Sequence, residues 1–74
     1  MQPNLSLRET QILQLIAVGM TTKEISATLA IAESTVNWHV GNTLAKLGAS
    51  SRAEAVAIML RRTLSLELAG GTVR

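Results

Sequence analysis

Apolar side chains recur at intervals of three and four residues along most of this chain, which is the spacing of one face of an α-helix. The residues that set this pattern are, in chain order, Ile12, Leu13 and Ile16, then Ile25 and Leu29, then Val36, Val40, Leu44 and Leu47. No segment alternates apolar and polar residues as a half-buried strand would, although residues 64–68 come close. The pattern therefore predicts helices and no sheet.

Three helix starts carry the same local signal, a hydroxyl residue followed three positions later by glutamate. These capping boxes are Ser6 with Glu9, Thr21 with Glu24, and Ser51 with Glu54. Gly19 and Gly48 are well placed to end the first and third helices in the left-handed conformation. We expect an all-α, four-helix fold with helices at about residues 7–18, 22–29, 33–47 and 52–63.

The stretch from Thr21 to Leu47 organises the rest of the chain. It combines a short capped helix, a brief turn at residues 30–32 with Ile31 pointing inward, and a longer helix. This layout is the pattern of a DNA-binding helix-turn-helix. Around it we expect a disordered start over residues 1–4, a domain over residues 5–64 and a flexible tail over residues 65–74.

Composition limits the possible functions. A chain of 74 residues, 47% of them hydrophobic, makes one small domain with a core built without Phe or Tyr. There is no Cys and only one His, and the five acidic residues are scattered, so we expect no disulfide, metal site, cofactor or catalytic group. No apolar run is long enough for a membrane span, and a net charge of +2 is compatible with nucleic acid without indicating it.

The fourth helix is apolar nearly all round, since residues 53–60 carry a single charge. Such a helix is usually buried on two sides. We expect Val56, Met59 and Leu60 to face the core and the opposite side to form a self-association surface, although an alanine-rich face also tolerates water. The candidates for this dimer interface are Ala53, Ala57, Leu60 and Leu64.

Five motifs in register resemble the LuxR-type (NarL/FixJ-like, GerE-like) helix-turn-helix domain of bacterial transcription regulators. They are Leu5-Ser-x-Arg-Glu9, Gly19-Met-Thr-Thr-Lys-Glu-Ile25, Ser34-Thr-Val-x-x-His39, Asn42-x-x-x-Lys-Leu-Gly48 and Ser51-Arg-Ala-Glu-Ala-Val56. The resemblance covers roughly residues 5–60. It implies double-stranded DNA as the partner, the third helix in the major groove and a homodimer through the fourth helix, formed in solution or only on DNA. It also implies an N-terminal regulatory domain in a longer parent protein and a place in the bacterial cytoplasm.

Helical geometry puts four residues on the side of the third helix opposite Val36 and Val40, and these are the candidates for base contact. They are Ser34, Asn37, Trp38 and Gly41. Asn37 can pair through two hydrogen bonds with an adenine edge. Trp38 can pack on thymine methyl groups or sugars, or be covered by a regulatory domain in a longer parent protein.

The candidates for phosphate contact are Thr22, Lys23, Thr35, His39 and Lys46. Thr22 and Lys23 begin a helix, where unpaired amides and the helix dipole favour an anion, while Thr35 and His39 follow from the resemblance. Lys46 and Arg52 could each flank the DNA backbone or be a solvated or paired charge. Glu9 is expected to cap its helix and pair locally, with Arg52 as the candidate partner.

The chain departs from the family pattern at the recognition surface. Family members often carry Lys or Arg where Asn37 stands, and some carry Lys where Gly41 stands. We expect weaker, less salt-sensitive binding, because each neutralised phosphate contributes a salt slope of about 0.9. Ala32 replaces the usual Ser or Thr cap, at a cost of about 1 kcal/mol.

Two other functions remain open at this point. A protein-binding helical module that does not bind DNA is favoured by the neutral recognition surface and the exposed Trp38. A promoter-recognition domain of the sigma-factor region-four type is also a helix-turn-helix, but the short fourth helix and the Lys46-Leu-Gly48 junction favour the LuxR-type domain. We expect a sequence-specific DNA-binding output domain and no enzymatic activity.

Overall fold

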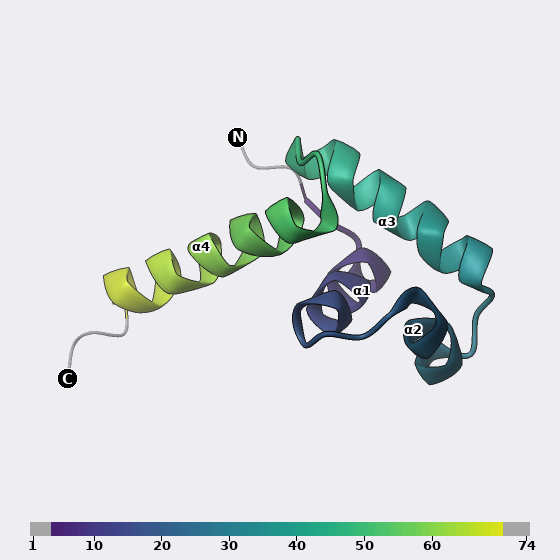
Figure 1. The fold of residues 1–74 in the computed structure, drawn as a ribbon. Coiled ribbons are helices and arrows are strands. Elements are labelled where there is room, and N and C mark those ends of the chain that lie inside the picture. The colour runs from purple at the N-terminus through teal and green to yellow at the C-terminus, as the bar shows by residue number, and fades with distance from the viewer. Residues whose placement is uncertain (1–3, 71–74) are drawn as a thin grey trace.

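The computed structural model describes residues 4–70 and contains four helices and no strand within that range (Figure 1). The helices are α1 Leu7–Ala17, α2 Thr22–Leu29, α3 Glu33–Leu47 and α4 Arg52–Gly70. All four predicted helix starts are confirmed, and the all-α fold with them. The predicted ends agree within one residue except in α4.

Side-chain caps fix the starts of α1 and α2. The hydroxyls of Ser6 and Thr21 each accept a hydrogen bond of 3.1 Å from the amide of the glutamate three residues later. The glutamate carboxylates in turn accept hydrogen bonds of 2.8 Å from the amides of the capping residues. Two of the three predicted capping boxes, those at Ser6 and Thr21, are therefore present as reciprocal pairs.

The cap of α4 differs in one bond. Ser51 Oγ accepts from the amide of Glu54 at 3.1 Å, but the Glu54 carboxylate accepts from the amide of Ser50 at 2.7 Å. The returned bond therefore reaches one residue further back than the predicted box required. This bond to the Ser50 amide holds the pKa of Glu54 below its ordinary value.

The turn between α2 and α3 is held by Ser26. Its hydroxyl donates to the carbonyl oxygen of Ile31 at 2.5 Å, and its carbonyl accepts from the Ile31 amide at 3.1 Å. Ala30 takes the left-handed conformation with φ 57°, which an L-residue with a Cβ adopts at a cost. The double tie to Ser26 keeps Ile31 packed against the core, as predicted.

The centre of the core joins the first three helices. Ile12 of α1, Ile25 of α2 and the pair Val36 and Val40 of α3 are all buried against one another. Partly buried neighbours complete it, namely Leu15, Ile16, Met20, Leu29, Ile31 and Leu44. The apolar stripes identified in the sequence therefore meet at one point.

The first turns of α4 pack on this body through Ala55, which is buried, while Val56 and Met59 are partly buried. The prediction that Leu60 faces the core is wrong, because that side chain is 50% exposed. Ala55 was not predicted as a core residue. Its small side chain allows α4 to approach the body closely.

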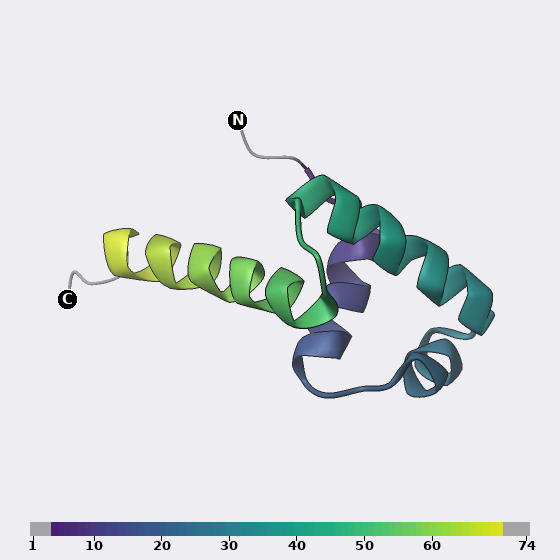
Figure 2. The ribbon, with the colours of Figure 1, turned by 45° about the horizontal axis from the view of Figure 1, so that its top comes forward.

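Beyond this contact α4 continues away from the body as a projecting helix (Figures 1 and 2). The predicted end at residue 63 is wrong, since α4 runs to Gly70. Residues 65–70 of the predicted flexible tail are helical, and residues 1–3 and 71–74 lie outside the described part of the chain. Leu, Glu and Ala favour helix, and this preference prevails over the strand-like alternation of Leu64, Leu66 and Leu68.

Candidate nucleic-acid interface

One side of α3 is exposed along the first three of its turns. Ser34, Asn37, Trp38 and Gly41 all lie on that side and are exposed, as the helical periodicity predicted. Val36 and Val40 face the opposite way and are buried. We call the four exposed residues the recognition surface.

Trp38 is the largest side chain of the recognition surface and is 64% exposed. Its ring makes an edge-to-face contact with the ring of His39, with centroids 5.0 Å apart. His39 is half-buried, and its Nδ1 is buried without a hydrogen-bond partner among the described residues. The ring nitrogen left for an outside partner is therefore Nε2.

Gly41 leaves a flat spot on the recognition surface. A Cβ placed there would meet no atom within 4 Å, so packing inside the protein does not require glycine. The residue sits within a helix, where glycine costs about 1 kcal/mol relative to alanine. Neither strain nor crowding in the described chain explains this glycine.

The start of α2 lies beside the recognition surface. Thr22 is half-buried and Lys23 is exposed. The Glu24 amide is taken by the Thr21 hydroxyl, and the amides at the very start of a helix have no partner within it. Thr35, at the start of α3, is half-buried. These groups place hydrogen-bond donors next to the exposed side of α3, together with the positive charge of Lys23.

A polar cluster connects three helices at this place. Arg52 Nη2, from the start of α4, donates to Thr22 Oγ1 at 2.8 Å and to Asn37 Oδ1 at 3.2 Å. The Thr22 hydroxyl donates in turn to Asn37 Oδ1 at 3.5 Å. We call these three residues the Arg52 cluster. It unites two predicted site residues with a third, Arg52, whose part in it the sequence did not indicate.

A signal for Arg52 was nevertheless present in the sequence. A cation at the first position of a helix opposes the helix dipole, which favours negative charge at that end. Arg52 therefore needs a partner elsewhere, and it finds two neutral oxygen atoms. No carboxylate takes part in the hydrogen bonds of this cluster, so the guanidinium charge is not neutralised within it.

The opposite end of α3 carries an ion pair. Lys46 Nζ lies 2.8 Å from Glu9 Oε1, and Glu9 is only 4% exposed. The hydrogen bond from Lys46, followed by the bond from the Ser6 amide, holds the pKa of Glu9 below its ordinary value of 4.5. The expected pairing of Glu9 with Arg52 is wrong. Lys46, for which the sequence left phosphate contact and a paired charge open, is paired with Glu9.

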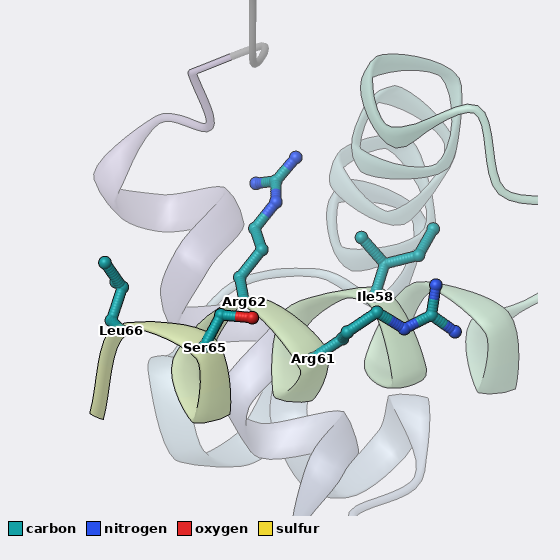
Figure 3. Close-up of a pocket in the computed structure, with 5 residues that line it drawn as sticks. All are labelled: Ile58, Arg61, Arg62, Ser65 and Leu66. Carbon is teal, nitrogen blue, oxygen red and sulfur yellow. The ribbon is translucent and has the colours of Figure 1, made fainter. Parts of the chain in front are cut away.

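The projecting part of α4 has a hollow along one flank, lined by Ile58, Arg61, Arg62, Ser65 and Leu66. All five come from a single helix, and the two guanidinium groups point in different directions (Figure 3). No set of polar groups converges there on a common point. In residues 4–70 there is no cluster of potential metal ligands and no helix long and apolar enough to cross a membrane.

The short α2, the three-residue turn and the longer α3 with one buried and one exposed face define a helix-turn-helix domain. Residues 3–59 match the family model described as bacterial regulatory proteins, luxR family. The chain belongs to this family of DNA-binding transcription regulators.

The relatives differ in length. Spore germination protein GerE of Bacillus subtilis is 42% identical over 60 residues, which cover 81% of each chain. The probable transcriptional regulatory protein NarL of Mycobacterium tuberculosis is 47% identical over 62 residues, but the match covers only 29% of that protein. A crystal structure of the response regulator ChrA of a haem-sensing two-component system matches with a TM-score of 0.79 and 33% identity, over 86% of this chain and 32% of that one. This chain thus spans most of GerE and less than a third of NarL or ChrA.

Proposed function

We propose that this domain binds double-stranded DNA in a sequence-specific manner and acts as the output part of a bacterial transcription regulator in the cytoplasm. In this proposal α3 enters the major groove and the recognition surface contacts base edges. The observation that carries it is the division of α3 into a buried apolar side and an exposed side bearing Asn37 and Trp38. A major groove about 12 Å wide admits an α-helix in this way.

The recognition surface has features that suit close contact with a groove. Asn37 supplies amide hydrogen-bonding groups, and Trp38 supplies an exposed apolar ring for thymine methyl groups or sugars. Gly41 allows DNA to approach the backbone of α3 without a side chain between them. This close approach would explain the glycine, which packing inside the protein does not require.

Phosphates on either side of the groove require donors. We assign these contacts to the amide of Thr22, to Lys23, to Thr35 and to the Nε2 atom of His39. We also include the Arg52 guanidinium, because its charge is not neutralised within its own cluster. We leave out Lys46, because its charge is paired with Glu9.

The exposed side of α4 supports dimer formation. Leu60 and Leu64 are 50% and 56% exposed, and with Ala53 and Ala57 they form one stripe at helical spacing. We propose that this stripe packs against its copy in a second molecule, in solution or only on DNA. In a longer parent protein, a regulatory domain on the N-terminal side would control this assembly.

Trp38 provides a direct test of DNA binding, since it is the only Trp in a chain without Tyr. Titration with a pool of duplexes at about 50 and 200 mM salt should change its fluorescence, more weakly at the higher salt. Asn37→Ala should reduce discrimination among the duplex sequences by about tenfold. Gln14→Ala, which truncates an exposed amide on α1, is the matched control and should behave as the wild type.

The dimer needs its own test. Leu64→Glu should weaken cooperative binding to a palindromic site, measured by sedimentation of the protein–DNA complex, because it buries a charge in the proposed contact. Leu66→Glu introduces the same charge on another side of α4, at a residue that is 75% exposed, and should leave assembly unchanged. Equal effects of the two substitutions would argue against the assigned stripe.

A protein-binding module without DNA binding is the second candidate, favoured by the large exposed ring of Trp38 on a surface with few charges. The two candidates separate in the titration. Absence of binding to any duplex at low salt would contradict DNA recognition and place this second function first.

A further inference from the structure

The side-chain amide of Asn37 is not free in this structure. Its oxygen accepts from Arg52 Nη2 at 3.2 Å and from the Thr22 hydroxyl at 3.5 Å. The same Arg52 nitrogen donates to Thr22 Oγ1 at 2.8 Å. That nitrogen thus donates to two different acceptors, and the three hydrogen bonds close a small ring.

The chemistry of the partners fixes which way the amide points. A guanidinium group has donors and no acceptor, so the amide atom facing Arg52 must be the oxygen and not the NH2 group. An amide oxygen has two lone pairs, and it accepts a hydrogen bond from Arg52 at 3.2 Å and a longer, weaker one from Thr22 at 3.5 Å. The Nδ2 group, with its two donors, is the part of Asn37 left for an outside partner.

We propose that Arg52 is a positioning residue that makes Asn37 a hydrogen-bond donor only. This inference rests on the proposed function, in which α3 lies in the major groove. The usual pairing of Asn with adenine needs the amide oxygen to accept from the adenine amino group, and here that oxygen is occupied. Guanine presents two acceptors, N7 and O6, on the same edge. Asn37 therefore favours guanine over adenine.

The cluster is built to hold this orientation. Arg52 starts α4 and is half-buried, Thr22 starts α2, and Asn37 lies in α3, so each side chain comes from a different helix. Rotation of the amide would place NH2 against a cation and break two hydrogen bonds at once. Because no carboxylate takes part, Arg52 also keeps its charge available to a phosphate.

The test begins by locating the base pair that Asn37 contacts. Random duplexes are selected for binding to the wild-type protein and, separately, to Asn37→Ala. The base pair that Asn37 contacts is identified as the position at which the wild type prefers one base and the variant prefers none. Synthetic sites then carry guanine, 7-deazaguanine, adenine or purine at this position, where purine is adenine without its amino group. We expect the wild type to lose about tenfold in affinity when N7 of guanine is removed, and less than about twofold when the adenine amino group is removed.

Arg52→Met keeps most of the stem and removes the guanidinium nitrogen that donates both hydrogen bonds. The freed Asn37 oxygen can then accept from adenine, so removal of the adenine amino group should now cost about tenfold. A residue with only a structural role would alter overall affinity without changing this response to single base atoms. Arg61→Met removes the same charge from an exposed position of α4 and should keep the wild-type response.

The outcomes separate two failures. A wild-type protein that already loses about tenfold without the adenine amino group would overturn the role of Arg52, and this measurement needs no variant. If Asn37→Ala changes preference at no position, or if the wild type enriches no sequence, base contact by α3 itself is wrong and the inference falls with it.

Discussion

The two ends of α3 are fixed to the rest of the molecule in different ways. At the C-terminal end, Gly48 closes the helix in the left-handed conformation with φ 67°, and Lys46 is paired with the buried carboxylate of Glu9. At the N-terminal end, Ala32 gives no side-chain cap, and the neutral amide oxygen of Asn37 accepts a hydrogen bond from Arg52. One end is closed and neutralised, while the other keeps unused donors and an unneutralised cation.

This difference separates stability from binding within one helix. The ion pair between Lys46 and the buried carboxylate of Glu9 holds α3 to α1, and the two charges neutralise each other. A cation held only by neutral acceptors keeps its attraction for an outside anion. The presence of a carboxylate partner therefore distinguishes Lys46 from Arg52 as a candidate for phosphate contact, although sequence position alone placed both near DNA.

The largest expected effect comes from breaking the closed end. Glu9→Gln removes the charge that Lys46 pairs with and should lower the free energy of unfolding by about 2 kcal/mol near neutral pH. Chemical denaturation followed by circular dichroism measures this. Glu24→Gln changes the same residue type in the exposed capping box of α2, and is the control expected to cost much less.

The effect of Glu9→Gln should also depend on pH. The pKa of Glu9 is lowered in the folded state, so its stabilisation is present above the ordinary value of 4.5 and is lost as the pH falls through the lower folded value. Wild type and variant should therefore converge in stability in acid. A difference that persists unchanged at about pH 3 would mean that the ion pair is not its source.

The next effect compares the two cations directly on DNA. Arg52→Met should lower affinity by about tenfold at low salt and reduce the salt slope by about 0.9, because it removes a phosphate contact. Lys46→Met should leave the slope unchanged, since Lys46 is already neutralised by Glu9. The measurement is affinity against salt concentration for both variants. Equal slopes for the two variants would remove the distinction between the ends of α3.

The smallest effects concern the glycines of α3 and its cap. Gly48→Ala should destabilise the domain by about 1 kcal/mol, because alanine is strained at positive φ. Gly41→Ala should stabilise it by up to about 1 kcal/mol, since that position is helical and open. Thermal unfolding would register each as a shift of several degrees, in opposite directions. The same sign for both would contradict the conformations described for them.

The sequence predicted what depends on neighbouring residues. The boxes at Ser6 and Thr21, the left-handed Gly48 and the exposed side of α3 all follow from contacts within one turn or one helix. The sequence also predicted that Ala32 gives α3 no side-chain cap. For these features, the spacing of the residues along the chain determines where their side chains lie relative to one another.

It did not predict contacts between distant segments. Lys46 lies 37 residues from Glu9, and Arg52 lies 30 from Thr22, so the partners of these cations depend on how the helices pack. The burial of Ala55 and the exposure of Leu60 depend on where α4 crosses the body. The roles of the candidate DNA contacts stay predictions.

The closed end of α3 also determines where a preceding segment would enter the domain. Asn4 and Leu5 line a hollow together with Leu47, at the far end of α3 from its first turn. A helix of 15 residues is about 22 Å long. A dye, an affinity tag or a fused domain joined ahead of Asn4 would therefore begin roughly 20 Å from the start of α3, and surface attachment through that point would leave the recognition surface accessible.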